Sequence, residues 1–421
     1  MSNLIAAAVV ALAYFAMAQT SGALAYAPTD AWTVWLASGV TLGVLLAAKR
    51  ARWGAILAGA AIGSAIFTLV INGTALDAAG YAAIEVASSG LAAWAAVRIA
   101  NSALELDSPR EVGIFLGAVM IQGLIGAALA GGWNVASGHH EGLRTFKVWL
   151  LSDVAGAILV SPLIITWAGF RPKRSGGLTM PQFAAGAAAF VMFVALLLLL
   201  FTGDTHARFG GSIGTALTYM PVLFICIVAL TWGARGASFA ALCGALITLF
   251  NTIHDHGPFA GVDDYVGEAE LEAQIFVSAM ALTGLLIAAL GARAQAALAE
   301  ARAWRARFEN AIGAHRLITY DWDPVGGAFV VSGDTATHLG VPASKIATLA
   351  DWLAHVAADE RDRTATAFGL RADGTVGPPL TYRVTAADGT PVTLVDEAQA
   401  VRDHEGTMYR ITGIVRVAAA A

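Results

Sequence analysis

The chain has 421 residues, of which 57% are apolar and 13% charged, whereas a soluble domain is about a quarter charged. This composition excludes a soluble enzyme. Residues 1–307 carry 16 basic and 16 acidic side chains, while residues 308–421 carry 9 and 14, so the net charge of −5 lies in the last quarter. No basic run typical of nucleic-acid binding occurs. The two distant cysteines, Cys226 and Cys243, favour neither a disulfide framework nor a cysteine metal site.

The first three quarters of the chain contain ten stretches that are apolar enough to cross a bilayer, which takes about 20 residues. The predicted spans are 4–26, 31–48, 53–71, 76–97, 111–131, 149–169, 183–203, 216–232, 236–253 and 271–291. Small residues recur in several of them, as expected where helix backbones approach closely in lipid. We therefore predict a polytopic α-helical membrane domain over residues 1–291.

The basic residues between the spans predict the direction of insertion, because cytoplasmic loops are enriched in Lys and Arg. One set of alternate loops holds Lys49, Arg50, Arg52, Arg98, Arg110, Arg171, Lys173, Arg174, Arg235, Arg293, Arg302, Arg305 and Arg307, and the other holds Arg144, Lys147 and Arg208. This bias predicts a multi-pass protein of the bacterial inner membrane with both termini in the cytoplasm. The first span also resembles a signal peptide, but no Lys or Arg precedes it, which argues against cleavage.

A linker helix is predicted after the last span, over residues 292–312, which contain neither Gly nor Pro. Trp304 and Phe308 belong to a stripe on one helix face; its other members are Ala294, Ala297, Ala301 and Ala311. We predict that this helix relays a signal through Trp304 and Phe308. A homodimer is expected, although the alanines make only a weak coiled-coil seam.

The spacing of apolar residues changes from Arg316 onward and predicts a small α+β domain over residues 313–421. Strands are expected at 317–322, 328–332, 379–386, 391–401 and 408–417, and helices at 334–339 and 349–370. Ala387-Asp388-Gly389 and Asp403–Gly406 are turn sequences, since Asp-Gly tolerates the positive φ of a hairpin turn. We predict a five-stranded antiparallel sheet with helices on one face.

This C-terminal segment resembles a PAS domain. The resemblance is carried by Tyr382-Arg383-Val384, Asp388-Gly389, Val401-Arg402-Asp403, Gly406 and Ile411-Thr412-Gly413-Ile414, whereas Ala357-Ala358 stand where the family usually has His-Pro. PAS domains bind flavin, haem or other small ligands, or act only as dimerisation and relay modules. The domain has no cysteine for a flavin adduct, and its histidines at 315, 338, 355 and 404 are isolated, so we expect no cofactor.

The membrane part, over residues 5–290, resembles the first class of the membrane-associated sensor domain (MASE) found at the front of bacterial histidine kinases and diguanylate cyclases. The resemblance is carried by Trp35-Leu36-Ala37-Ser38-Gly39, Glu85, Trp149-Leu150-Leu151-Ser152-Asp153, Ser161-Pro162-Leu163 and Gly257-Pro258-Phe259.

Glu85 and Asp153 are the main candidate site residues, because a carboxylate in the bilayer costs about 2.5–3.5 kcal/mol at the helix centre. One interpretation is a polar cavity that binds a cationic or hydroxyl-rich signal or holds a proton. The other is structural, with hydrogen bonds to Ser88, Gln122, Asn134 or backbone groups. The remaining candidates for signal binding are Trp35, Ser38, Pro162 and Pro258. We expect no metal site, since His254 and His256, like the pair at 139–140, offer too few ligands.

The sequence contains no phosphoacceptor and ATP-binding module, no cyclase signature and no phosphodiesterase signature, so we expect no enzyme activity in this chain. The function expected is a sensory protein that relays a membrane or periplasmic signal through the PAS domain. Its partner would be a cytoplasmic kinase, cyclase or regulator, as in two-component systems. The alternatives are a PAS-regulated transporter, or the sensory fragment of a kinase or cyclase whose gene continues beyond residue 421.

Overall fold

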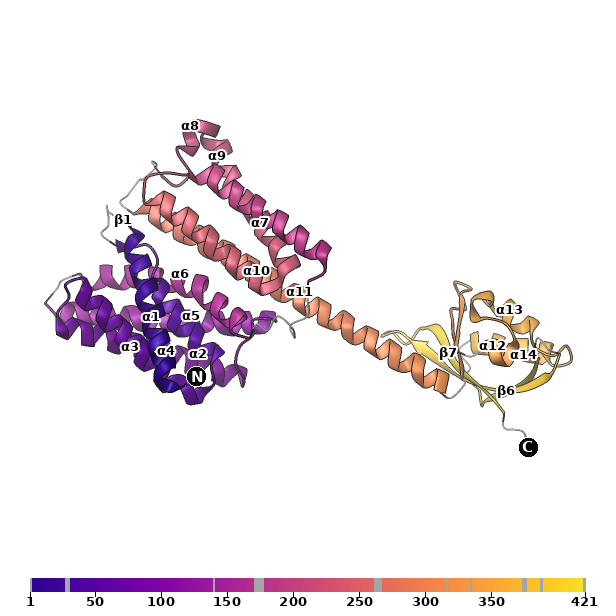
Figure 1. Ribbon diagram of the computed structural model, residues 1–421. Coiled ribbons are helices and arrows are strands. Elements are labelled where there is room, and N and C mark those ends of the chain that lie inside the picture. The colour runs from indigo at the N-terminus through magenta and orange to yellow at the C-terminus, as the bar shows by residue number, and fades with distance from the viewer. Residues whose placement is uncertain are drawn as a thin grey trace. The chain divides into compact units, whose positions relative to one another are not determined.

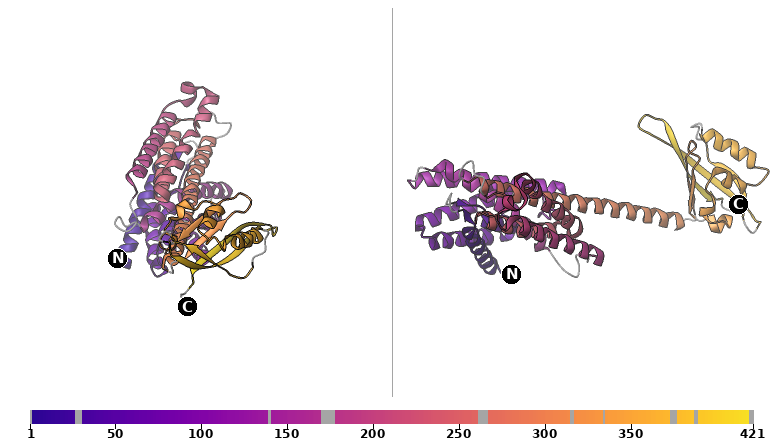
Figure 2. Two further views of the ribbon diagram at one scale, coloured as in Figure 1. Left: turned by 90° about the vertical axis from the view of Figure 1, so that its right-hand side faces the viewer. Right: turned by 90° about the horizontal axis from the view of Figure 1, so that it is seen from above.

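The computed structural model describes residues 2–26, 31–138, 141–169, 178–260, 267–314, 317–333, 335–372, 377–386 and 389–418. The chain divides into two compact units, residues 1–296 and residues 297–421. The helix α11 contributes to both, because it runs without a break from Glu268 to Ala314. Figure 1 and the right-hand view of Figure 2 show it as one continuous helix.

The first unit is built almost entirely from helices. Its elements are α1 (Asn3–Ala23), β1 (Ala25–Tyr26), β2 (Ala31–Trp32), α2 (Leu36–Ala47), η1 (Arg50–Arg52), α3 (Trp53–Val70), α4 (Ala75–Ala100), α5 (Pro109–Ala136), α6 (Gly142–Ala168), α7 (Met180–Phe201), α8 (Thr205–Phe209), α9 (Gly211–Leu217), α10 (Met220–Thr252) and α11. Thr74 and Thr179 cap the N-termini of α4 and α7 with capping boxes. In each box the threonine side chain accepts from the backbone amide three residues later, and the side chain of that residue accepts from the threonine amide.

Eight helices of the described residues are long and apolar enough to cross a membrane, whereas the sequence predicts ten spans. The predicted span 31–48 contains only the 12-residue helix α2, about 18 Å long, because residues 33–35 are not helical. The predicted spans 216–232 and 236–253 lie together in α10. Each predicted span thus overlaps a helix, although two of them share α10 and one contains only the short helix α2.

The helix α10 reverses direction at Gly233, where φ is +66° and ψ is −160°. Glycine adopts a positive φ at no steric cost. A Cβ on Gly236 would lie 3.2 Å from the Val228 side chain, although eight residues of a straight helix span about 12 Å. The halves of α10 therefore fold back on each other and correspond to two predicted spans.

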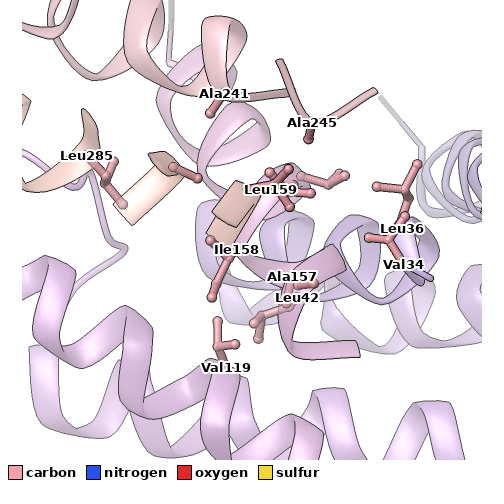
Figure 3. Close-up of a cluster of buried hydrophobic side chains, with 14 of the residues drawn as sticks. Val34, Leu36, Leu42, Val119, Ala157, Ile158, Leu159, Ala241, Ala245 and Leu285 are labelled. Atoms are coloured by element: carbon pink, nitrogen blue, oxygen red, sulfur yellow. The ribbon is translucent and has the colours of Figure 1, made fainter. Parts of the chain in front are cut away.

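Apolar side chains both fill the interior of the first unit and cover its outside. Leu12, Trp94, Val191 and Leu230 are each more than half exposed, as expected for helices that face lipid tails. Inside, one buried cluster joins α2, α5, α6, α10 and α11. Figure 3 shows part of it, including Leu42, Val119, Ile158, Ala245 and Leu285. This arrangement is that of a multi-pass membrane protein.

The helices α2 and α6 approach closely because each presents a glycine to the other. A Cβ on Gly156 would lie 1.9 Å from the carbonyl oxygen of Trp35, and one on Gly39 would lie 2.5 Å from the carbonyl oxygen of Gly156. Small residues allow such close backbone contact in a membrane. The contact holds the residues that precede α2 against α6.

The second unit contains a five-stranded antiparallel sheet in its described part, as predicted. The elements are β3 (Ile318–Trp322), β4 (Phe329–Gly333), α12 (Thr335–Leu339), η2 (Ala343–Lys345), α13 (Leu349–Ala354), α14 (Arg361–Ala372), β5 (Leu380–Thr385), β6 (Pro391–Arg402) and β7 (Met408–Val417). The strand order is β4-β3-β7-β6-β5. Figure 1 shows α12, α13 and α14 together beside the sheet. Of the first predicted turn, Gly389 has a φ of +80°, and residues 387 and 388 lie outside the described residues.

The prediction of a single helix over residues 349–370 was wrong, because the chain forms α13 and α14 with a break between them. At the break, Val356 forms a bridge with Val384, and the amide of Ala357 donates to the carbonyl of Arg383. The side chain of Arg361 also donates to carbonyls at the end of α13. At Val356 and Ala357 the backbone therefore pairs with β5 instead of continuing the helix, although the sequence around them favours a helix.

Replacing Gly156 with Ala should destabilise the first unit, because the added methyl group would overlap the backbone of Trp35. Overpacking of this kind costs about 1–3 kcal/mol. Gly117 in α5 provides the control, since a Cβ there would meet open space. Thermal unfolding of the purified chain in lipid nanodiscs should show a lower midpoint for Gly156→Ala than for Gly117→Ala. Equal midpoints would contradict the tight contact between α2 and α6.

Candidate signal-binding site

The connections α1–α2, α3–α4 and α5–α6 meet at one end of the first unit. Residues 24–35, 71–74 and 137–141 in these connections contain no Lys or Arg, so we call this the arginine-poor end. The side chains described below lie between this end and the middle of the helices.

The residues before α2 form an irregular backbone whose polar groups bind three other helices. The amide of Trp35 donates to the carbonyl of Ser152 in α6 at 2.9 Å. The amide of Leu36, the first residue of α2, has no acceptor within the helix and donates to Ser21 Oγ in α1 at 2.9 Å. The carbonyl of Thr33 accepts from Gln274 Nε2 in α11 at 2.6 Å. Non-helical backbone inside a membrane protein requires such partners, and here they fix Trp32 and Trp35 in place.

Glu85 in α4 is 4% exposed, and both of its carboxylate oxygens accept hydrogen bonds. Tyr14 in α1 donates its hydroxyl to Oε2 at 3.4 Å, and Ser89 donates to Oε1 at 2.9 Å. Ser88, which the structural interpretation named, donates to the backbone carbonyl of Glu85 instead. Both carboxylate oxygens of Glu85 therefore have partners within the described part of the unit.

Asp153 in α6 is 3% exposed, and its Oδ2 accepts from the indole nitrogen of Trp149 at 3.0 Å. Gly126 in α5 makes room for this pair, since a Cβ there would lie 3.2 Å from Oδ2. Ser38 in α2 donates to the backbone carbonyl of Asp153 at 3.3 Å. The carboxylate thus lies at the contact between α2, α5 and α6.

A chain of hydrogen bonds connects the surroundings of the two carboxylates. Gln122 in α5 donates from Nε2 to Ser89 Oγ at 3.0 Å and to the carbonyl of Ser38 at 3.3 Å. Ser89 in turn binds Glu85, and Ser38 binds the backbone of Asp153. A change at one acidic residue can therefore be transmitted to the other through two helices.

Two cavities open beside these carboxylates, with volumes of about 310 Å³ and 250 Å³. Glu85 lines the first cavity and Asp153 lines the second. Both are lined by Trp32, Trp35, Tyr81 and Trp149, so the same aromatic walls separate and border them. We call the two cavities together the vestibule. Its rim lies at the arginine-poor end, where Asn72, Ser137 and Glu141 of the connections belong to the lining. Arg144, in the first turn of α6, also belongs to the rim.

Aromatic rings pack in pairs along the vestibule. Trp32 and Trp35 are stacked with ring centroids 4.7 Å apart, and Tyr81 and Trp149 are stacked at 5.5 Å. Phe67 in α3 meets Trp35 edge to face at 5.3 Å. The vestibule thus combines aromatic faces with buried carboxylates.

The structure brings four of the sequence-predicted candidates together and places two elsewhere. Trp35, Glu85 and Asp153 line the vestibule, and Ser38 lies directly behind it. Pro162 is buried within α6 next to Ser161, whose hydroxyl donates to the carbonyl of Gly39. Pro258 is also buried, beside Gly257, whose amide donates to the carbonyl of Gly203 at the end of α7. Neither proline belongs to the lining of the vestibule.

Several residues of the site were not predicted. They are Tyr14, Trp32, Tyr81 and Trp133. Each lies in an apolar stretch, where an aromatic residue is indistinguishable from core or lipid-facing residues. Gln122 and Asn134 were named as partners of the carboxylates: Gln122 reaches Glu85 only through Ser89, and Asn134 lines the same cavity as Glu85.

The second unit has a buried polar network that the sequence analysis missed. Arg371 in α14 donates from one guanidinium nitrogen to Asp396 Oδ2 at 2.9 Å and to the hydroxyl of Tyr320 at 2.7 Å. Tyr320 donates to Asp396 Oδ1 at 3.1 Å, and Trp352 donates to the hydroxyl of Tyr382 at 3.0 Å. Alternation along β6 places Asp396 on the same buried face as Leu394, so the strand pattern contained a usable signal.

Burial and the nearby Asp396 carboxylate raise the pKa of Tyr320 and Tyr382 above the ordinary tyrosine value. Both hydroxyls therefore keep their protons and remain donors to Asp396. The network joins α14 to the sheet inside the domain, where Phe329 and Phe368 pack around it.

The PAS motif residue Arg383 binds the acidic pair that follows Ala357-Ala358. Its guanidinium contacts Asp359, and its Nε donates to Glu360 Oε1 at 2.8 Å. Hydrogen bonds from Arg383 lower the pKa of Glu360. This ion pair keeps the central loop against β5 although the usual His-Pro is absent.

The predicted relay residues and histidines lie outside these networks. Trp304 and Phe308 in α11 are 63% and 59% exposed. Among the described residues, no group of three His, Cys, Asp or Glu side chains could hold a metal ion. The histidines at 139, 140 and 315 lie outside the described residues, and His404 lies on the surface.

Replacing Arg371 with Met should strongly destabilise the second unit, because it leaves the Asp396 carboxylate buried without its cation. Breaking a buried pair costs about 3–5 kcal/mol. The exposed pair Arg416–Glu397 provides the control, and Arg416→Met should cost about 0–1 kcal/mol. Hydrogen exchange of β6 amides in the intact chain under increasing urea would measure both. Equal losses would show that burial does not set the strength of the Arg371 pair.

Comparison with known proteins places these two units in families. The MASE1 model matches residues 4–295, and the model of the PAS fold matches residues 329–415. No curated protein matches the chain.

Two solved structures are similar to about a quarter of the chain. One is the N-terminal domain of a diguanylate cyclase with PAS/PAC sensor from Marinobacter aquaeolei, at 20% identity and a TM-score of 0.23, covering 24% of this chain and 94% of that one. The other is a sensory box histidine kinase/response regulator from Burkholderia thailandensis E264, at 21% identity and a TM-score of 0.22, covering 26% and 83%. The MASE1 match covers more than two thirds of the residues of the present chain. The chain therefore belongs to the MASE1 family, and a PAS domain follows its membrane unit.

Proposed function

We propose that this chain is a sensory protein of the bacterial inner membrane, which relays a signal from the vestibule to a cytoplasmic partner through the PAS domain. The observation that carries the proposal is the hydrogen bond from Gln274 Nε2 to the carbonyl of Thr33. Thr33 lies between Trp32 and Trp35, which line the vestibule, and Gln274 belongs to α11. A shift of the aromatic wall would therefore act directly on α11.

The continuity of α11 supports transmission from this contact to the PAS domain. The helix has 47 residues, so it is about 70 Å long. It contains Gln274 near its start and Trp304 and Phe308 near its end. No Gly or Pro lies between Ala292 and Ile312 to absorb a rotation, so a shift or rotation at the start of this segment is transmitted to its end.

The exposed face of the PAS sheet supplies a surface for the partner. Val330 in β4 and Ile414 in β7 are 61% and 49% exposed. They line one hollow with Phe308 and Ile312 of α11. We propose that this surface binds the signalling partner or a second copy of the chain, so that a movement of α11 alters how much of it is accessible.

A reporter enzyme that is active only in the periplasm tests the proposed orientation. Fused at residue 421 it should be silent, because the charge bias places both termini in the cytoplasm. The same reporter inserted after Ser137, in the α5–α6 connection, should be active and serves as the control. Strong activity of the fusion at 421 would overturn the proposed topology.

Insertions into α11 test the relay itself. One Ala after Ala299 rotates the following residues by about 100°, whereas seven added residues leave a drift of about 20°. If α11 transmits a rotation, the single insertion should lock or abolish the response and the seven-residue insertion should largely preserve it. The response is measured as the signal-dependent yield of the partner cross-linked to the chain in membranes. Equal tolerance of both insertions would mean that α11 is a passive tether.

A further inference from the structure

We propose that the vestibule binds a small organic cation with an alkylammonium group, held between the aromatic walls and the carboxylates of Glu85 and Asp153. The inference rests on the proposed function, since it names the chemical class of the signal. It chooses the cation among the three possibilities that the residue types leave open, which are a cation, a hydroxyl-rich ligand and a proton.

The charge of the lining favours a cation. The vestibule contains four carboxylates, those of Asp77, Glu85, Glu141 and Asp153. Among its described lining residues, Arg144 is the one basic side chain, and its guanidinium lies 2.8 Å from Glu141 at the rim. Glu85 and Asp153 therefore have no basic partner in the lining. Carboxylates in a membrane interior are costly without a counter-charge, and a bound cation would provide one.

The aromatic walls favour an organic cation over a bare metal ion. The faces of Trp and Tyr attract a cation that lies within about 6 Å of the ring centroid. Trp32, Trp35, Tyr81 and Trp149 present such rings on the shared walls of both cavities. No three metal-ligating side chains gather in the described part of the site, and a cavity of about 310 Å³ is far larger than an inorganic ion needs.

The hydrogen-bond groups of the vestibule disfavour a neutral, hydroxyl-rich ligand. The indole N–H groups of Trp133 and Trp149 already donate to Asp77 and Asp153, and the hydroxyl of Tyr14 donates to Glu85. These three aromatic donors are thus committed to carboxylates. Asn134 Oδ1 is buried and accepts no hydrogen bond from the described residues. This buried acceptor matches the N–H or polarised C–H groups of an ammonium.

Direct binding of radiolabelled choline to the full chain tests this inference. The chain is placed in nanodiscs of phosphatidylglycerol, which has no ammonium group, at constant ionic strength. Choline should bind and be displaced by tetramethylammonium, but not by 3,3-dimethylbutan-1-ol, the neutral analogue with carbon in place of nitrogen. Equal competition by the neutral analogue would overturn the proposal, because it would show an apolar cavity without charge recognition. Absence of saturable binding of both cations would also overturn it.

Substitutions locate the bound cation. Asp153→Asn and Glu85→Gln should each weaken choline binding tenfold or more, while Asp107→Asn, an exposed carboxylate outside the vestibule, should leave it unchanged.

Tyr81→Leu should weaken binding by about three- to tenfold through loss of one ring face. Trp94→Leu, an exposed aromatic residue of the same helix, is its control. Tyr81→Leu removes no buried charge, so it keeps the test valid if an acidic variant fails to fold. Unchanged affinity in folded variants of the vestibule would contradict the assignment.

A free solute and a lipid headgroup are the two sources of such an ammonium group, and a second set of nanodiscs separates them. If phosphatidylcholine in the disc competes with free choline, the headgroup reaches the vestibule; if it does not, the ligand is a solute. The choline-binding measurement does not require the signalling response that the α11 insertions test. Loss of specific binding with an intact response to the α11 insertions would overturn this inference alone, whereas specific binding without any insertion effect would overturn the relay.

Discussion

The non-helical backbone of residues 31–35 is the constraint on which the rest of the site depends. Inside a helical membrane unit, such backbone is tolerated only when other parts of the protein satisfy its polar groups. Here α1, α6 and α11 supply those partners through Ser21, Ser152 and Gln274. The same contacts fix Trp32 and Trp35 beside the buried carboxylates. A local break in helical structure therefore creates both the wall of the vestibule and its connection to α11.

Much of the fold follows from patterns that the sequence contains. Apolar length identifies the membrane helices, and strand alternation with Asp-Gly turns identifies the five-stranded sheet. The errors have tertiary causes. The span predicted at 31–48 is only partly helical because Trp35 pairs with Ser152 rather than within a helix. The helix predicted over 349–370 is divided because Val356 pairs with Val384. Neither partner is close in sequence, so periodicity could not indicate the break.

The acidic residues of the site were predictable, but its aromatic walls were not. A carboxylate in an apolar span is rare enough to indicate a buried polar site, which is how Glu85 and Asp153 were identified. Tyr81 and Trp32 give no such signal, because an aromatic residue suits lipid, core and cavity alike. Pro162 and Pro258 were selected by motif, and the structure places them in packing contacts outside the vestibule. Three-dimensional proximity, rather than residue type, separates these cases.

The central claim is that the vestibule and the linker part of α11 are coupled through Gln274. Hydrogen exchange of residues 292–312 in the intact chain, with and without tetramethylammonium, measures this coupling directly. The account predicts that the cation changes exchange in this segment of the unsubstituted chain. In Gln274→Leu, the cation should still protect the segment around residues 33–38, while residues 292–312 should no longer respond. An equal response of residues 292–312 in both chains would contradict the account.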